Sequence, residues 1–147
     1  MRVLILLVTV IGQLIGGLLF DPVKAAQATV FFESVLKHTK GQFAGQPFVL
    51  LPWERKIVQD VYGTVKEDGT RQYKYVYIEL PKKNGKSELG AGFALKQLFA
   101  DGEKNAEVYS CAADRGQASI VFDVASDMVE YSPVLKKISK TTDSTKR

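Results

Sequence analysis

Helical patterns occupy four stretches of the chain, residues 21–41, 52–63, 88–100 and 118–131. In the first, second and fourth of these stretches, apolar side chains recur every three or four positions and therefore fall on one side of a helix. Proline stands next to the start of the first two stretches, and a glycine or a Ser-Pro pair stops each of the four. Such residues begin and end helices for conformational reasons. The sequence therefore predicts four helices.

Two apolar runs with the β-branched and aromatic composition of strands lie between these helices, at residues 73–80 and 108–111. Asp68-Gly69 marks a tight turn before the first run. Strands that alternate with helices at this spacing favour an α/β fold with a parallel sheet. Three large side chains of the helical patterns are expected in the hydrophobic core: Trp53, Phe122 and Met128.

The segment between the first strand and the third helix, residues 81–87, reads Pro-Lys-Lys-Asn-Gly-Lys-Ser. A strand, a Gly-Lys-Ser loop and a helix in this order suit phosphate binding, because N–H groups of the turn and the helix start point at phosphate oxygens. In such a loop Lys86 neutralises the β- and γ-phosphates, the Ser87 hydroxyl binds Mg²⁺, and Gly85 allows close backbone approach. Leu80 stands where the common pattern has glycine, so a solvated basic turn is the alternative interpretation.

Composition and charge change this picture little. The 147 residues are 46% hydrophobic and 24% charged, which excludes disordered, collagen-like and low-complexity classes and indicates one domain or a piece of one. The net charge of +4 lies entirely within residues 136–147. A basic terminal run is usually a solvated tail, and a nucleic-acid-binding module that acts through this tail is a further hypothesis.

The cysteine content and the N-terminus give conflicting signals. Cys111 is the single cysteine, which fits a reducing compartment and a buried structural thiol. An uncharged run from Val3 to Phe20 has the length of a signal sequence or a marginal membrane span, and residues 26–28 offer a cleavage site. Cleavage there would cut the helix that starts after Asp21. We therefore separate residues 1–20, a signal-like or spurious apolar segment, from a domain at residues 21–147.

Four motifs in order carry a family resemblance: Leu-Leu-Pro-Trp-Glu at 50–54, Asp-Gly-Thr-Arg at 68–71, Leu-Pro-Lys-Lys-Asn-Gly-Lys-Ser at 80–87 and Ala-Ala-Asp-Arg-Gly-Gln-Ala at 112–118. From about Asp21 onward, the chain resembles the terminase large subunit family of tailed phages, the ATPase of the DNA-packaging motor. That family has a phosphate-binding loop without the first glycine, so Leu80 fits the resemblance. The implied fold is a P-loop NTPase-like parallel sheet flanked by helices, here incomplete.

The resemblance implies ATP and Mg²⁺ as cofactors. Lys82 stands where such proteins usually have arginine, and it lacks the bidentate fork of arginine. The segment at Trp53 is similar to the family's adenine-recognition motif, in which Glu54 replaces a usual glutamine and, when ionised, only accepts hydrogen bonds. The implied nucleotide-binding residues are Trp53, Glu54, Lys82, Lys83, Asn84, Gly85, Lys86 and Ser87, with Ser87 also the metal ligand.

The resemblance further implies packaging of viral DNA into the prohead, in the cytoplasm of the host cell. Double-stranded phage DNA, the terminase small subunit and the portal are the implied partners. We find no counterpart of the acidic Walker B strand or of the nuclease domain, and we expect a truncated ATPase domain that binds nucleotide without efficient hydrolysis. An open sheet edge would favour self-association. The alternative is a small membrane-tethered or secreted α/β binding module with no nucleotide site.

Overall fold

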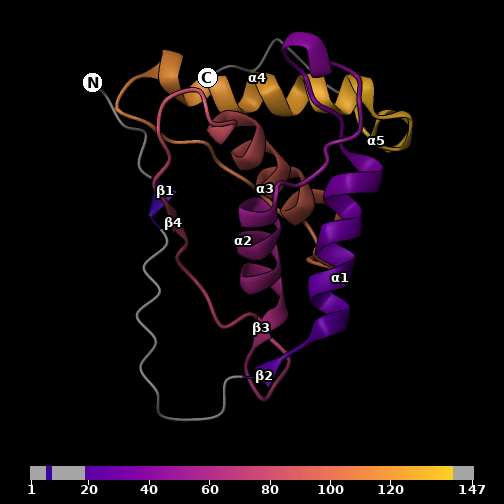
Figure 1. The fold of residues 1–147 in the computed structure, drawn as a ribbon, viewed down its shortest axis with the longest axis vertical. Helices are drawn as coiled ribbons and strands as arrows, with labels where there is room; N and C mark the ends of the chain where they lie inside the picture. Colours follow the sequence, from indigo (N-terminus) through magenta and orange to yellow (C-terminus); the bar gives the residue numbers. More distant parts are fainter. Residues whose placement is uncertain (1–5, 8–18, 141–147) are drawn as a thin grey trace. The chain divides into compact units, whose positions relative to one another are not determined.

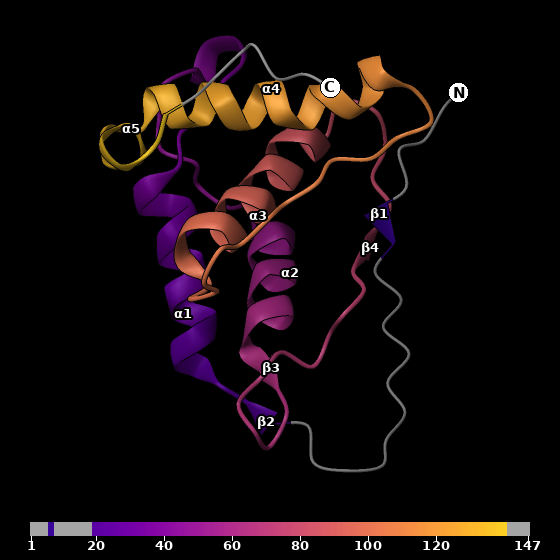
Figure 2. The ribbon, with the colours of Figure 1, turned by 180° about the vertical axis from the view of Figure 1, so that it is seen from behind.

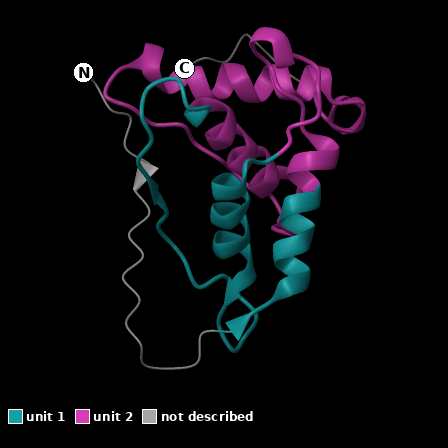
Figure 3. Ribbon diagram, viewed as in Figure 1, with its two compact units in different colours: residues 1–30, 50–86 teal, residues 31–49, 87–147 magenta. Residues whose placement is uncertain are grey.

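A computed structural model describes residues 6–7 and 19–140. Helices dominate, and short strands accompany them (Figure 1; Figure 2 shows the same ribbon from behind). The described chain divides into two compact units (Figure 3): unit 1 within residues 1–30 and 50–86, and unit 2 within residues 31–49 and 87–147. The helices are α1 (Pro22–Val30), the π-helix η1 (Phe31–Val35), the 3₁₀-helix η2 (Gly41–Phe43), α2 (Pro52–Gly63), α3 (Lys86–Ala100), α4 (Arg115–Tyr131) and α5 (Pro133–Ile138).

In unit 1, α1 packs against α2. The α1 helix begins where the sequence predicts, because Oδ1 of Asp21 accepts hydrogen bonds from the N–H groups of Val23 at 2.9 Å and Lys24 at 3.0 Å. Small side chains let the two helices approach closely. A Cβ on Gly63, the last residue of α2, would lie 2.7 Å from the Phe20 ring and 2.9 Å from Cβ of Ala25. Glycine at position 63 therefore both ends α2 and makes room for its neighbours.

The strands form two short antiparallel pairs, both in unit 1. Strand β1 (Leu6–Leu7) pairs with β4 (Tyr77–Ile78), and β2 (Leu19–Phe20) pairs with β3 (Thr64–Val65). Two dipeptides of the apolar N-terminal run thus take part in pairing, while residues 8–18 lie outside the described part of the chain. Among the described residues no strands pair in parallel, which differs from the sequence-based expectation.

The predicted strands are shortened or missing. Only Tyr77–Ile78 of the run at 73–80 is a strand, and the run at 108–111 has no strand structure. The prediction of a strand at 108–111 is wrong, and the reason is exposure: Val108 is 40% and Tyr109 77% exposed. The β preference of such side chains depends on packing against neighbouring strands, which this segment lacks.

The core of unit 2 is aromatic. The fully buried Phe32 ring, in η1, packs edge-to-face on Phe48 and Phe93, with ring centroids 6.0 and 5.6 Å apart. Gly92 of α3 lies under the same ring, and a Cβ at that position would overlap it. The predicted helix at 21–41 is shorter in the structure. It consists of α1 followed directly by the π-helix η1, and it ends at Val35.

The two C-terminal helices are set by side-chain caps. Oδ1 of Asp114 accepts a hydrogen bond from the N–H of Gln117 at 2.9 Å, and α4 begins at the next residue, Arg115. Ser132 is fully buried, and its hydroxyl oxygen accepts from the N–H of Leu135 at 3.4 Å. The Ser-Pro pair therefore ends α4 and also starts α5, a helix that the sequence analysis did not predict.

Several burial predictions need correction. Met128 is buried as predicted, but Phe122 is 46% exposed because it lies on the side of α4 opposite the buried Val124. Trp53 is 36% exposed, because the buried face of α2 contains Val58, Val61 and Tyr62 and does not include position 53. Cys111, which was expected to be buried, is exposed as well. Among the described helices, none has the length and apolar character needed to cross a membrane.

Candidate functional site

The predicted order of strand, Gly-Lys-Ser loop and helix is present in the structure. Strand β4 ends at Ile78, the loop follows, and α3 begins at Lys86. Residues 81–85 are exposed, whereas Lys86 and Ser87 are half-buried in the first turn of α3. The 15-residue helix directs its positive dipole end toward the loop. The start of α3 therefore offers N–H donors and a positive dipole end to an anion at the loop.

Two loop residues have left-handed backbone conformations. Gly85 has φ +67°, and Lys83 has φ +72°. Glycine adopts this region freely, whereas a residue with a side chain pays about 1–2 kcal/mol for it. A Cβ on Gly85 would meet only one atom at ordinary contact distance, Oε1 of Glu54 at 3.7 Å. Glycine is therefore required at position 85 mainly because of the left-handed backbone, and less because a side chain would lack space.

Lys86 is held only loosely. Its Nζ donates a long hydrogen bond of 3.4 Å to the carbonyl oxygen of Leu80, at the other end of the loop. Gly85, the residue directly before α3, has no side chain that could cap this first turn. The N–H groups at a helix start lack partners within the helix, so this turn offers donors to an anion, and the Lys86 ammonium lies beside them.

The Trp53-Glu54 segment reaches the same loop within unit 1. Glu54 is 5% exposed, and its Oε2 accepts a hydrogen bond from the N–H of Leu51 at 2.9 Å, which fixes the start of α2. Its other carboxylate oxygen lies near Gly85, 3.7 Å from the point where a Cβ on that residue would stand. Two motifs that lie 30 residues apart in the sequence therefore meet in space. Lys82, Lys83 and Asn84 are exposed.

Glu88, which the sequence did not indicate, follows Ser87 directly and accepts three hydrogen bonds. It accepts hydrogen bonds from the Thr39 N–H at 2.7 Å, the Thr39 hydroxyl at 2.9 Å and Nδ1 of His38 at 2.8 Å. Burial raises the pKa of Glu88, but these hydrogen bonds outweigh it and hold the pKa below its usual range. The partners lie about 50 residues away in the sequence, so no local pattern indicates them.

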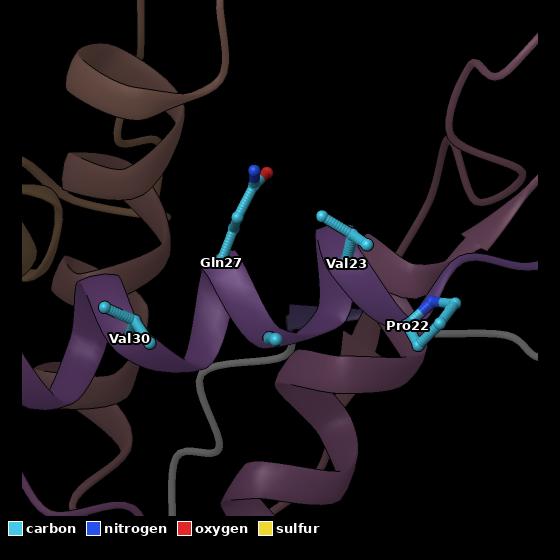
Figure 4. Close-up of a pocket in the computed structure, with 5 residues that line it drawn as sticks. Pro22, Val23, Gln27 and Val30 are labelled. Carbon is cyan, nitrogen blue, oxygen red and sulfur yellow. The ribbon is translucent and has the colours of Figure 1, made fainter.

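A separate apolar pocket lies along α1 in unit 1 and is lined by Pro22, Val23, Ala26, Gln27 and Val30 (Figure 4). The polar end of Gln27 points away from the helix there, and apolar side chains make up the rest. None of the predicted nucleotide-binding residues lines this pocket. Its lining lacks the charged groups that would recognise a phosphate.

Comparison with known proteins gives two matches. The family described as "Terminase large subunit, ATPase domain" matches residues 52–147. The large terminase subunit of Enterobacteria phage HK97 is 30% identical over 125 residues, which cover 84% of this chain and 24% of that protein. The chain therefore spans about a quarter of the length of this relative. No solved structure matches the chain.

Proposed function

Because the chain belongs to the terminase large subunit family through its ATPase domain, we propose that residues 80–87 bind the triphosphate of ATP together with Mg²⁺. The observation that carries this proposal is the start of α3 at Lys86, directly after the left-handed Gly85, which has no side chain to cap the helix. An anion at this point gains both the helix dipole and a lysine ammonium.

The loop residues fit such a ligand. Lys86 would neutralise the β- and γ-phosphates, and the Ser87 hydroxyl would coordinate Mg²⁺. Lys82 and Lys83, both exposed, add positive charge around the phosphates, and Asn84 and Gly85 supply backbone N–H groups. When bound, the metal ion neutralises part of the charge on the phosphate oxygens.

We assign base recognition to Trp53 and Glu54. The indole is partly exposed at the start of α2, and an exposed aromatic ring can stack on a base. The proximity of Glu54 to Gly85 supports one continuous site in unit 1 that extends from the loop to this segment.

The larger role we propose is that of its family, a motor ATPase that packages viral DNA in the cytoplasm of the host cell. A P-loop NTPase-like sheet, double-stranded phage DNA, the terminase small subunit and the portal belong to this proposal. Since we match no segment of the 147 residues to an acidic Walker B pair, we expect them to bind ATP and hydrolyse it slowly. Strand β3 pairs with β2 and is also bridged to Arg71 through Val65. The other described strands have one partner each, and their unpaired edges support the proposed self-association.

A binding titration tests the nucleotide site. A ribose-labelled fluorescent ATP analogue with Mg²⁺ is added to the 147-residue chain, and unlabelled ATP is then used to displace it. Saturable binding that ATP reverses supports the proposal. Absence of binding at millimolar analogue would leave the loop as a solvated basic turn.

Replacement of Glu54 with glutamine is expected to strengthen binding of the same analogue by about three- to tenfold. The Glu54 carboxylate lies near Gly85, where its negative charge repels a phosphate, and the loop at this point is exposed. Charges about 4 Å apart interact by about 1 kcal/mol in water. Glutamine keeps an oxygen that accepts from the Leu51 N–H, so the start of α2 is retained. Glu67→Gln, at an exposed turn of unit 1, is the matched control. Unchanged or weaker binding in E54Q contradicts this role of the charge.

A further inference from the structure

Glu88 ties the first turn of α3 to a distant segment of unit 2. Among the described residues, all of its hydrogen bonds go to two consecutive residues, His38 and Thr39, and three donors share its two oxygens. The Glu88 side chain is 15% exposed and that of His38 24%, so water competes weakly for these bonds. Charge-assisted hydrogen bonds in such surroundings are among the stronger ones in proteins.

The segment that supplies these donors is itself fixed. The His38 ring stacks on Phe48 with centroids 4.5 Å apart, and Phe48 packs edge-to-face on Phe32 in the aromatic core. The backbone N–H of His38 donates to the carbonyl oxygen of Gln46 at 2.9 Å, and that of Phe48 to the oxygen of Leu36 at 3.1 Å. The Glu88 carboxylate therefore attaches α3 to a part of unit 2 that is anchored in its core.

This attachment acts on the residue just before it. Ser87 shares the first turn of α3 with Glu88, and the terminal turn of a helix opens more readily than its middle. A carboxylate held by three bonds restricts this turn and with it the direction of the Ser87 hydroxyl.

We propose that Glu88, held by His38 and Thr39, is a positioning residue that orients the Ser87 hydroxyl toward the magnesium ion of a bound nucleotide. The inference rests on the proposed function, because it requires a nucleotide at the loop. It assigns Glu88 no contact with the nucleotide or with the metal. Groups that orient a metal ligand commonly change metal affinity by about 10–100-fold when they are removed.

The test separates the metal-dependent part of nucleotide binding from the rest. The affinity of the full 147-residue chain for the fluorescent ATP analogue is measured with Mg²⁺ and again with EDTA, and the ratio is the gain due to the metal. Glu88→Ala is expected to reduce this gain by about tenfold and to leave the affinity in EDTA within about twofold. Glu88→Gln still accepts from Thr39 and should keep most of the gain. Glu103→Ala, an exposed carboxylate of unit 2, is the matched control.

A milder variant covers the case in which E88A unfolds. Thr39→Val removes one of the three hydrogen bonds and keeps the backbone donor, so it should give a smaller loss of the metal-dependent gain in a folded chain. An unchanged ratio in both E88A and T39V, or equal losses with and without Mg²⁺, overturns the positioning role while nucleotide binding by the wild type stands. A wild-type chain that binds no analogue overturns the proposed function and this inference together.

Discussion

Replacement of Lys86 with alanine is expected to weaken binding of Mg-ATP by about 30- to 150-fold. The variant loses the ammonium at the start of α3, and a hydrogen bond to a charged group contributes about 1.5–3 kcal/mol, with further loss where two phosphates share the charge. Each 1.4 kcal/mol corresponds to a tenfold change in the dissociation constant. The fluorescent ATP analogue measures this change directly in a titration.

The folded state should tolerate the K86A change. The Lys86 ammonium makes one long hydrogen bond of 3.4 Å, and alanine is the best helix former at the start of α3. Circular dichroism should therefore show an unchanged spectrum and a closely similar unfolding midpoint. Lys104→Ala, at an exposed position outside the loop, removes the same charge and should leave affinity within about twofold. Equal affinities of wild type and K86A would exclude Lys86 as the phosphate-binding lysine.

Replacement of Phe32 with alanine is expected to lower the free energy of unfolding by about 3–5 kcal/mol. The ring is fully buried and packs edge-to-face on Phe31, Phe48 and Phe93. Its loss leaves a cavity under η1 that rigid helices refill poorly. Urea unfolding followed by circular dichroism measures the loss. Phe122→Ala, which removes an equal ring that is 46% exposed, should cost much less.

Gly92 offers an independent check of this core. A Cβ at position 92 would overlap the Phe32 ring, so Gly92→Ala should cost about 1–3 kcal/mol through overpacking. In a Phe32→Leu background the smaller side chain leaves room, and the cost of G92A should fall. Such non-additivity is the signature of residues in direct contact. Strictly additive costs would show that the two residues do not meet.

The helices could be predicted from the sequence because their ends are encoded locally. Asp21-Pro22 starts α1 by a side-chain cap, Pro52 starts α2, and Gly63 ends it at a point where only glycine fits. The order of strand, loop and helix around Lys86 follows from the same local signals, whereas the left-handed conformation of Gly85 was not predicted.

The strands and the burial of single side chains could not be predicted in this way. Antiparallel pairing of Leu19–Phe20 with Thr64–Val65 joins segments that are distant in sequence, and nothing in the run at 108–111 indicates that its side chains stay exposed. Trp53 was expected in the core because helical spacing alone does not define how wide a buried face is.

The residues around the loop at 81–87 also differ in how far the sequence reveals their role. The loop residues themselves are contiguous in the sequence, so a phosphate-binding role could be predicted from the sequence alone. The proximity of Glu54 to Gly85 and the bonds of Glu88 to residues 38 and 39 depend on tertiary structure. The family resemblance implied only that Glu54 and Gly85 both bind the nucleotide, and nothing in the sequence indicated the bonds of Glu88.

The central claim is that Mg-ATP binds at the start of α3. The most direct measurement is a two-dimensional ¹H–¹⁵N NMR titration of the labelled 147-residue chain with Mg-ATP, read residue by residue. The account predicts that the largest shifts occur at the amides of Asn84, Gly85, Lys86, Ser87 and Glu88, and that they saturate. Shifts confined to the apolar pocket on α1, or no shifts at millimolar Mg-ATP, would contradict it and favour a binding module without a nucleotide site.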